Sequence, residues 1–273
     1  KDGITPFDSH VVQQIKKSGF LLLGKSIAPE MGWALSSENE MHGVVKNPWD
    51  LNLTPGGSSG GSAAAISSRI TPISDGSDGG GSIRVPASNC GLVGLKPSRG
   101  RVSLSPASAD YWYGGAIFFC MSRTVRDTAA FLECTGGSIP GDPYYMPLPK
   151  EGFLNSVSNE PGKLKIAFVD ESPDGCTVID PEIKSGINKV AKNLETLGHH
   201  VSHQPIPYDF WELNNAYTNI TTLQTSAFFD NFEPIVGRKL EEKDTTNLYW
   251  TMYLKGKEIT GHQHSNHVEN LRQ

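Results

Sequence analysis

The sequence predicts an α/β fold with a central mixed β-sheet flanked by helices. Two stretches carry this prediction. Residues 163–204 have the pattern of a strand, a long amphipathic helix and a second strand. Residues 71–90 have the pattern of a strand, a glycine-rich turn and a further compact segment. At 273 residues, of which 37% are hydrophobic, the chain is long enough to bury a sizeable core.

The first predicted elements lie before residue 50. A helix should begin with Asp8 as its N-cap, end at Gly19 and carry three apolar side chains on one face: Val11, Val12 and Ile15. The apolar run at 20–23 predicts a short buried strand. Residues 26–49 are rich in loop signals and include a turn at KNPWD.

Later elements follow the same alternation. The alanine-rich run at 61–69 predicts a helix, and residues 71–82 predict a strand that ends in a glycine turn. A polar, Pro- and Gly-rich passage at 136–162 predicts a surface connection. Beyond it, the helix at 180–200 aligns four apolar side chains: Ile183, Ile187, Val190 and Leu194. The sequence stops without a closing strand, so we expect the fold to be incomplete at the C-terminus.

Composition limits the classes of function. The net charge of −5 offers no dominant basic patch, so nucleic acid is not an expected partner. Neither a membrane-spanning apolar run nor a signal-peptide pattern is present, so a cytoplasmic location is predicted. The four cysteines form no CxxC pair and are expected to be buried free thiols. Two histidine clusters, 199–203 and 262–267, lack a carboxylate or cysteine at ligand spacing, so no metal site and no cofactor are predicted.

Two stretches of glycine and serine predict acyl-transfer chemistry. They are GGSSGGS at 56–62 and DGGGS at 78–82. Consecutive glycines allow the main chain to point several N–H groups at one spot, as an oxyanion requires, and Gly79, Gly80, Gly81 and Ser82 could supply them. Ser82 follows these donors directly and is the natural nucleophile. No histidine lies between His42 and His199, so a neutral lysine is the expected base.

These stretches resemble the amidase signature family, whose members hydrolyse or transfer acyl groups from amides. The resemblance rests on TPGGSSGGSAAA, GSDGGGSIRVPAS and GLVGLKPSRGRVS, together with LLGKSIAPEMG and NPWDL, and runs from about Asp8 to Asp127. It implies one amidase signature domain over 1–273, with its motif core at 8–127 and a further α/β segment at 163–273. The stretch that begins at GRVSLSP is closer to general amidases and cyclic-amide hydrolases than to amidotransferase subunits.

The resemblance also implies a triad of serine, cis-serine and lysine. Ser82 would be the nucleophile, and Ser58, 24 residues earlier, would be the cis-serine that bridges it to the lysine. The glycines around Ser58 would permit a non-proline cis peptide bond. Lys1, in the pair KD, is the matching lysine, although the family has a longer loop where only a few residues separate Asp2 from Phe7.

The remaining candidates support these groups. Asp78 would orient the oxyanion loop through hydrogen bonds to its backbone, Arg84 would brace the site against a carboxylate, and Ser59 would support it. The expected partner is a small-molecule amide, with a homodimer as an open alternative and no membrane. Two other functions stay open: an amidotransferase subunit that works with partner chains, and a relative that only binds.

Overall fold

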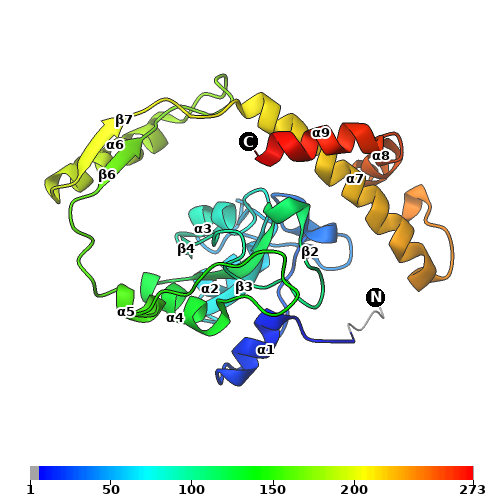
Figure 1. Ribbon diagram of the computed structural model, residues 1–273, viewed down its shortest axis with the longest axis horizontal. Coiled ribbons are helices and arrows are strands. Elements are labelled where there is room, and N and C mark those ends of the chain that lie inside the picture. The colour runs from blue at the N-terminus through cyan, green and yellow to red at the C-terminus, as the bar shows by residue number, and fades with distance from the viewer. Residues whose placement is uncertain (1–5, 273) are drawn as a thin grey trace. The chain divides into compact units, whose positions relative to one another are not determined.

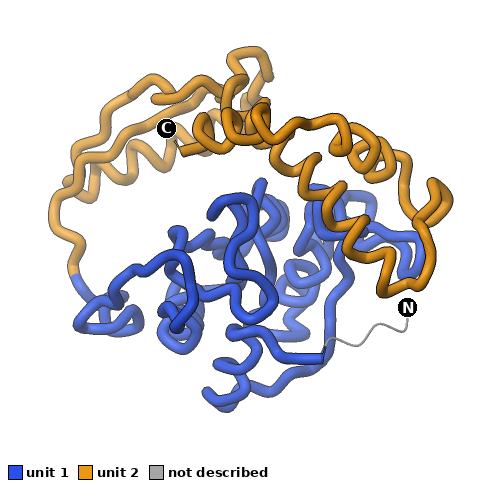
Figure 2. Tube along the Cα trace, turned by 45° about the vertical axis from the view of Figure 1, so that its right-hand side comes forward, with its two compact units in different colours: residues 1–159 blue, residues 160–273 orange. Residues whose placement is uncertain are grey.

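The computed structural model describes residues 6–272, which form two compact units (Figures 1 and 2). The first unit ends at Asn159 and the second begins at Glu160. This boundary lies inside the surface connection expected at 136–162.

The first unit is built on a three-stranded antiparallel sheet. Its order is β3 (Ile73–Asp78), β5 (Ile117–Ser122) and β4 (Val93–Gly94), so β5 is the middle strand. β3 and β5 pair from Ile73 opposite Ser122 to Asp78 opposite Ile117. Four consecutive residues of β5, from Phe119 to Ser122, are buried, because this strand is covered on both faces.

Helices complete the core of this unit. α2 (Gly60–Ser67) packs against β3 and β5, and α3 (Arg84–Cys90) packs against α2 and β4. α4 (Val125–Thr135) packs against β5, α1 (His10–Lys17) and α5 (Phe153–Ser156). The shorter elements are β1 (Glu38–Asn39), β2 (Gly43–Val44), η1 (Glu30–Gly32) and η2 (Trp112–Gly114). The core therefore forms between α2 and α4 on the two sides of β5.

The N-terminal helix differs from the prediction at its first residue. Ser9, not Asp8, is the N-cap of α1, and its hydroxyl accepts a hydrogen bond from the Val12 N–H. Asp8 instead forms an ion pair of 2.6 Å with Lys16. A serine directly before the first turn satisfies the unpaired N–H groups there, which leaves the carboxylate to bind a cation two turns later.

The strand predicted at 20–23 is wrong, because this segment has no strand partner and is not buried. Leu21 and Leu23 are 88% and 74% exposed. Only Phe20 reaches the core, where its ring meets Phe131 edge to face at 5.9 Å. An apolar run alone does not distinguish a buried strand from an extended surface segment.

The second unit contains a βαβ motif and a helical part. β6 (Lys165–Phe168), α6 (Pro181–Thr196) and β7 (His200–His203) follow one another as predicted, and the two strands pair in parallel. The predicted apolar face of α6 is only partly covered, since Ile183 and Val190 remain 59% and 57% exposed. The helical part was not predicted: α8 (Asn247–Gly256) and α9 (Gly261–Arg272) pack against the 27-residue α7 (Phe210–Val236), with η3 (Glu242–Asp244) between α7 and α8.

The α/β class is confirmed, with antiparallel pairing in the first unit and parallel pairing in the second. Within residues 6–272 the named strands are distributed over three small sheets. No helix in that range combines the length and the apolar character needed to cross a membrane.

Replacing Phe119 should test the core around β5. Phe119 is fully buried and its ring meets Phe131 at 5.4 Å, so Phe119→Ala should lower the free energy of unfolding by about 3–5 kcal/mol. The neighbouring Phe118 is 37% exposed, so Phe118→Ala should cost about 1 kcal/mol. Urea unfolding of both variants measures the difference, and equal losses would contradict this description of the core.

Candidate active site

Ser82 lies in a turn between a strand and a helix. β3 ends at Asp78 and α3 begins at Arg84, so the glycine run occupies the short turn between them. Gly81 has a φ of +124°, which a residue with a side chain rarely adopts. Ser82 is itself buried, with 7% exposure. The sequence therefore places its candidate nucleophile in a short buried turn next to the first turn of a helix.

The Asp78 carboxylate organises this turn. It accepts hydrogen bonds from the N–H groups of Gly81 at 2.9 Å, Ile83 at 3.2 Å and Arg84 at 3.2 Å. The Arg84 guanidinium adds two more bonds, each 2.9 Å long, one to each carboxylate oxygen. Asp78 is fully buried, so these five donors replace the water that its charge has lost.

The charge state of Asp78 reflects two opposing effects. Burial alone would raise the pKa of this carboxyl group. Hydrogen bonds and charge from Arg84, helped by the N–H groups of Gly81 and Arg84, outweigh burial and hold the pKa below its ordinary value. Asp78 is therefore a carboxylate throughout the neutral range.

These bonds change the expected set of oxyanion donors. The Gly81 N–H is directed at Asp78 Oδ1, so in this conformation it serves the carboxylate. The candidate donors that remain from the predicted set are Gly79, Gly80 and Ser82.

Gly79 lies against an aromatic ring. A Cβ atom at this position would stand 2.1 Å from Cζ3 of Trp112, far inside van der Waals contact. Trp112 is buried and in turn meets the ring of Trp33 at 5.3 Å. The indole therefore fills the space that a side chain at residue 79 would need.

Ser58 lies in the other glycine-serine stretch. The peptide bond between Gly57 and Ser58 is cis, as expected from the sequence. Gly56 has a φ of +81°, and Ser58 is 2% exposed. This second candidate hydroxyl is therefore buried in a tight turn immediately before α2.

The two stretches meet directly. The Ser59 N–H donates a hydrogen bond of 3.2 Å to the carbonyl oxygen of Ser82. The Ser59 hydroxyl accepts a bond of 3.2 Å from the N–H of Ser77 and donates one of 3.4 Å to its carbonyl. Ser59 therefore ties the turn that carries Ser58 both to the turn that carries Ser82 and to strand β3.

Ser37 also holds this turn and was not found from the sequence. Its hydroxyl contacts the carbonyl oxygens of Gly56 at 2.9 Å and Ser58 at 3.2 Å, and accepts a 2.9 Å bond from the Gly60 N–H. Ser37 occurs in ALSSENE, a polar run with the composition of an ordinary loop. No local signal in that run marks it as a contact of a segment about 20 residues away.

Lysines were candidates for the base. Lys1 lies outside the described residues. Two other lysines, Lys25 in LLGKS and Lys96 in GLKPS, have sequence contexts that predict structural roles. Burial lowers the pKa of Lys96, and the charge of Asp78 partly opposes this effect. A lowered pKa brings a lysine closer to the neutral form that a base needs.

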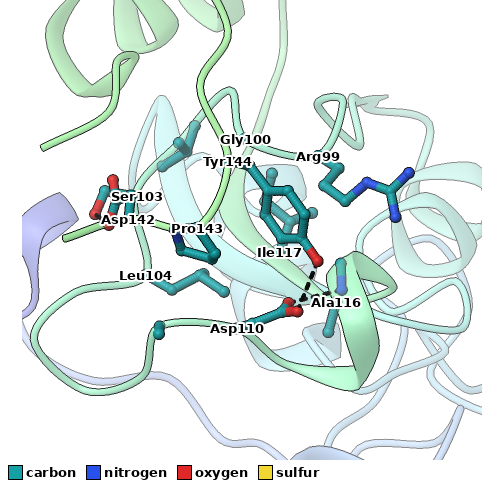
Figure 3. A pocket seen from close by; sticks show the side chains of 13 residues that line it. Arg99, Gly100, Ser103, Leu104, Asp110, Ala116, Ile117, Asp142, Pro143 and Tyr144 are labelled. Atoms are coloured by element: carbon teal, nitrogen blue, oxygen red, sulfur yellow. Dashed lines mark hydrogen bonds between the residues drawn. The ribbon is translucent and has the colours of Figure 1, made fainter. Parts of the chain in front are cut away.

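A pocket in the first unit is lined by residues of 99–117 and 142–144 (Figure 3). Asp110 accepts bonds there from the Tyr144 hydroxyl at 2.9 Å and the Gly114 N–H at 2.6 Å. Arg99 lies over the Tyr144 ring, 5.3 Å from its centre. Ala116 lines this pocket and lies 3.0 Å from the place where a Cβ of Gly79 would stand. Ala116 therefore connects the pocket lining to the surroundings of Gly79, while none of residues 79–82 lines the pocket itself.

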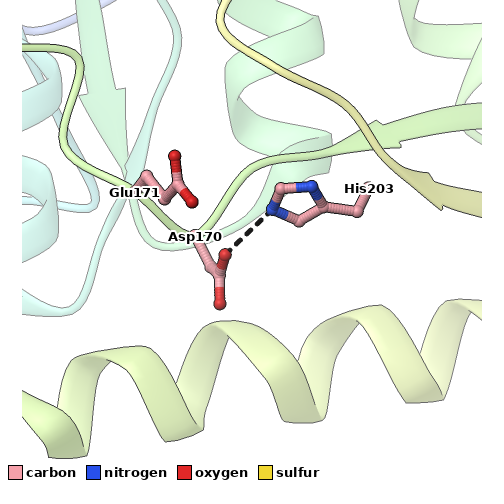
Figure 4. Close-up of side chains that lie close together, drawn as sticks. All are labelled: Asp170, Glu171 and His203. Carbon is pink, nitrogen blue, oxygen red and sulfur yellow. Dashed lines mark hydrogen bonds and ion pairs between the residues drawn. The ribbon is translucent and has the colours of Figure 1, made fainter. Parts of the chain in front are cut away.

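One histidine has carboxylate neighbours that its sequence context did not indicate. Asp170 and Glu171 lie beside His203, with one potential ligand atom from each residue within 4.8 Å of the others (Figure 4). His203 Nε2 is 3.1 Å from Asp170, and the Lys184 ammonium is 3.3 Å from the same carboxylate. A cation would have to compete with Lys184, so the absence of a metal site stays a prediction.

All four cysteines are free thiols, but only two are buried as predicted. Burial raises the pKa of Cys90 to about 11 and also raises the pKa of Cys120. Cys134 is partly exposed, and Cys176 is exposed in the second unit.

The pairing of Asp78 with Arg84 predicts a pH-dependent contribution to stability. Because the folded pKa of Asp78 is lowered, its contribution is complete above the ordinary value of about 3.9 and is lost as the pH falls through the folded pKa. At pH 7, Asp78→Asn should lower the free energy of unfolding by about 2–3 kcal/mol, less than for a fully buried pair because Arg84 is half exposed.

Urea unfolding of wild type and Asp78→Asn between pH 7 and pH 2 measures this contribution. The difference between the two proteins should shrink only below about pH 3.9. Arg84→Gln should weaken the same pH dependence, because it removes the main favourable partner. A constant difference down to pH 2 would contradict the assignment.

Comparison with known proteins gives the family. The sequence model of the family described as Amidase matches residues 1–270. A 6-aminohexanoate-cyclic-dimer hydrolase from Paenarthrobacter ureafaciens is 35% identical over 268 residues, which are 97% of this chain and 54% of the relative. A lipoamidase from Enterococcus faecalis is 34% identical over 267 residues, which are 96% of this chain and 34% of that one.

The fold agrees with this result. The solved structure of 6-aminohexanoate cyclic dimer hydrolase complexed with substrate superposes with a TM-score of 0.93 at 35% identity, covering 97% of this chain and 56% of that one. The chain spans about half the length of the cyclic-dimer hydrolases that it matches. With a family match over almost every residue and a shared fold, the chain belongs to the Amidase family.

Proposed function

We propose that this protein hydrolyses a carbon–nitrogen amide bond through an acyl-enzyme on Ser82. One observation carries the proposal: the turns that hold Ser58 and Ser82 are joined by the 3.2 Å bond from the Ser59 N–H to the Ser82 carbonyl, and both serines are buried. In a member of the Amidase family, a backbone link between the turns that carry Ser58 and Ser82 supports the roles that the sequence resemblance implies for these two serines.

The proposed reaction has two stages. Ser82 Oγ attacks the amide carbonyl while its proton passes through Ser58 to neutral Lys1. N–H groups of Gly79, Gly80 and Ser82 stabilise the tetrahedral oxyanion. The carbon–nitrogen bond then breaks and the leaving amine takes the proton. Water attacks the resulting ester while its proton passes through Ser58 to Lys1. The ester bond then breaks, Ser82 Oγ takes that proton back, and the acid is released.

Asp78 and Arg84 support this chemistry without touching the substrate. Asp78 bonds the backbone on both sides of Ser82, at Gly81 and Ile83, so it fixes the turn before and after the nucleophile. Because the turn is fixed in this way, the proposed oxyanion donors need little rearrangement when charge develops on the oxyanion.

The substrate class that we propose is a small linear or cyclic amide. The likeness to a 6-aminohexanoate-cyclic-dimer hydrolase over 97% of the chain supports it. Neither Ser58 nor Ser82 lines the pocket at Asp110 and Tyr144, so this pocket does not define the substrate class.

Removing the Ser82 hydroxyl tests the proposal. Ser82→Ala should lower kcat on a simple aryl amide by at least about 10³-fold and abolish covalent labelling by a fluorophosphonate, because the acyl-enzyme cannot form. The matched control is Ser88→Ala, an exposed serine on α3, which should keep both activities.

Persistent labelling or turnover in Ser82→Ala would overturn the proposal, and so would a wild-type protein that shows neither. The same assay on Lys1→Ala, Lys25→Ala and Lys96→Ala identifies the base. Lys1→Ala should lose the most activity if Lys1 accepts the proton.

A further inference from the structure

We propose that Ser37 is a positioning residue for the reaction, because it fixes the turn from which Ser58 acts. The inference rests on the proposed function. Its basis is the buried hydroxyl of Ser37, which contacts the backbone on both sides of the Ser58 side chain. It bonds the Gly56 carbonyl before Ser58, and the Ser58 carbonyl and the Gly60 N–H after it.

The Ser37 hydroxyl both donates to this turn and accepts from it. Its hydroxyl hydrogen faces two carbonyl oxygens, those of Gly56 at 2.9 Å and Ser58 at 3.2 Å, while its oxygen accepts from the Gly60 N–H at 2.9 Å. Ser37 is 1% exposed, so water cannot readily replace any of these bonds. Losing the hydroxyl would free the backbone on both sides of residue 58.

Ser37 also accepts a hydrogen bond from the first N–H group of α2, which the N-cap side chain does not do. Ser59 is the N-cap of α2, yet its side chain makes no capping bond, because its hydroxyl is engaged with Ser77 on β3. The Gly60 N–H, at the first residue of α2, is satisfied by Ser37 instead. The start of α2 is therefore held by a side chain from a distant loop, and Ser59 remains available to join the two turns.

Close packing of the backbone accompanies these bonds. A Cβ on Gly57 would stand 2.2 Å from the Ser36 carbonyl oxygen, and a Cβ on Gly60 would stand 2.4 Å from Ser37 Oγ. The segment 36–37 thus lies directly against the turn that carries Ser58. Glycines at 57 and 60 allow this close approach, and the hydrogen bonds of the Ser37 hydroxyl hold the backbone of the turn in place.

The test compares Ser37→Ala with Ser37→Thr and Ser122→Ala. Ser122 is a matched control because it is fully buried in the same unit, and its hydroxyl bonds the Thr124 carbonyl and the Thr128 hydroxyl at 2.7 Å each. All variants are made in the intact gene product and assayed for kcat and KM on an aryl amide, for the rate of fluorophosphonate labelling and for Tm.

Ser37→Ala should lower kcat and the labelling rate by about 10²-fold with little change in KM, because a misplaced reacting group costs rate rather than ground-state binding. Its Tm should fall about as far as that of Ser122→Ala, which should keep its activity. Ser37→Thr, which retains the hydroxyl, should recover most of the rate.

Two results would overturn the inference: a Ser37→Ala protein as active as Ser122→Ala, or a folded Ser37→Thr protein as slow as Ser37→Ala. If Ser82→Ala and Ser58→Ala abolish activity in the same assay, either result overturns the positioning role alone. If Ser82→Ala leaves activity intact, the proposed function fails, and the role of Ser37 fails with it.

Discussion

The candidate site depends on one buried charge, the Asp78 carboxylate at the end of β3. It accepts hydrogen bonds from three backbone N–H groups and from Nε and Nη2 of Arg84, so the chain must wrap around it within six residues. The geometry of the glycine run, the start of α3 and the position of Ser82 all follow from this wrapping. A neutral side chain of the same shape could not attract so many donors.

The second turn is organised in a complementary way. Hydroxyl groups, rather than a charge, hold it: Ser37 from a preceding loop and Ser59 from within the turn. The two turns are then joined through the Ser59 N–H and the Ser82 carbonyl. The site is therefore a junction between two backbone turns, each fixed by a buried polar group, rather than a cluster of side chains on rigid strands.

Much of the first unit could be predicted because its signals are local. Glycines after a strand pattern mark the turn before α3, and the alanine run marks α2. The residues themselves supplied Ser82, Asp78 and Arg84 as candidates and the resemblance supplied Ser58, and all four lie in or beside the two turns. Local signals failed where contacts are distant: Ser37 has no feature that reveals its bonds to the turn at 56–60.

Other errors have similar physical causes. The run at 20–23 is apolar but finds no strand partner, so its hydrophobicity did not determine its conformation. The carboxylates beside His203 come from the end of a different strand and were invisible as spacing along the chain. The long helix α7 has polar residues distributed among its apolar ones, and it is stabilised by packing against α8 and α9 rather than by one clear apolar face.

The contact between Gly79 and Trp112 has an evolutionary consequence. The indole occupies the volume of any side chain at residue 79, so such a side chain requires residue 112 to move or to become smaller. Alanine at residue 79 is therefore compatible with a smaller or displaced residue 112, whereas losing the tryptophan alone opens a void beside the glycine run. The two positions should covary as a pair.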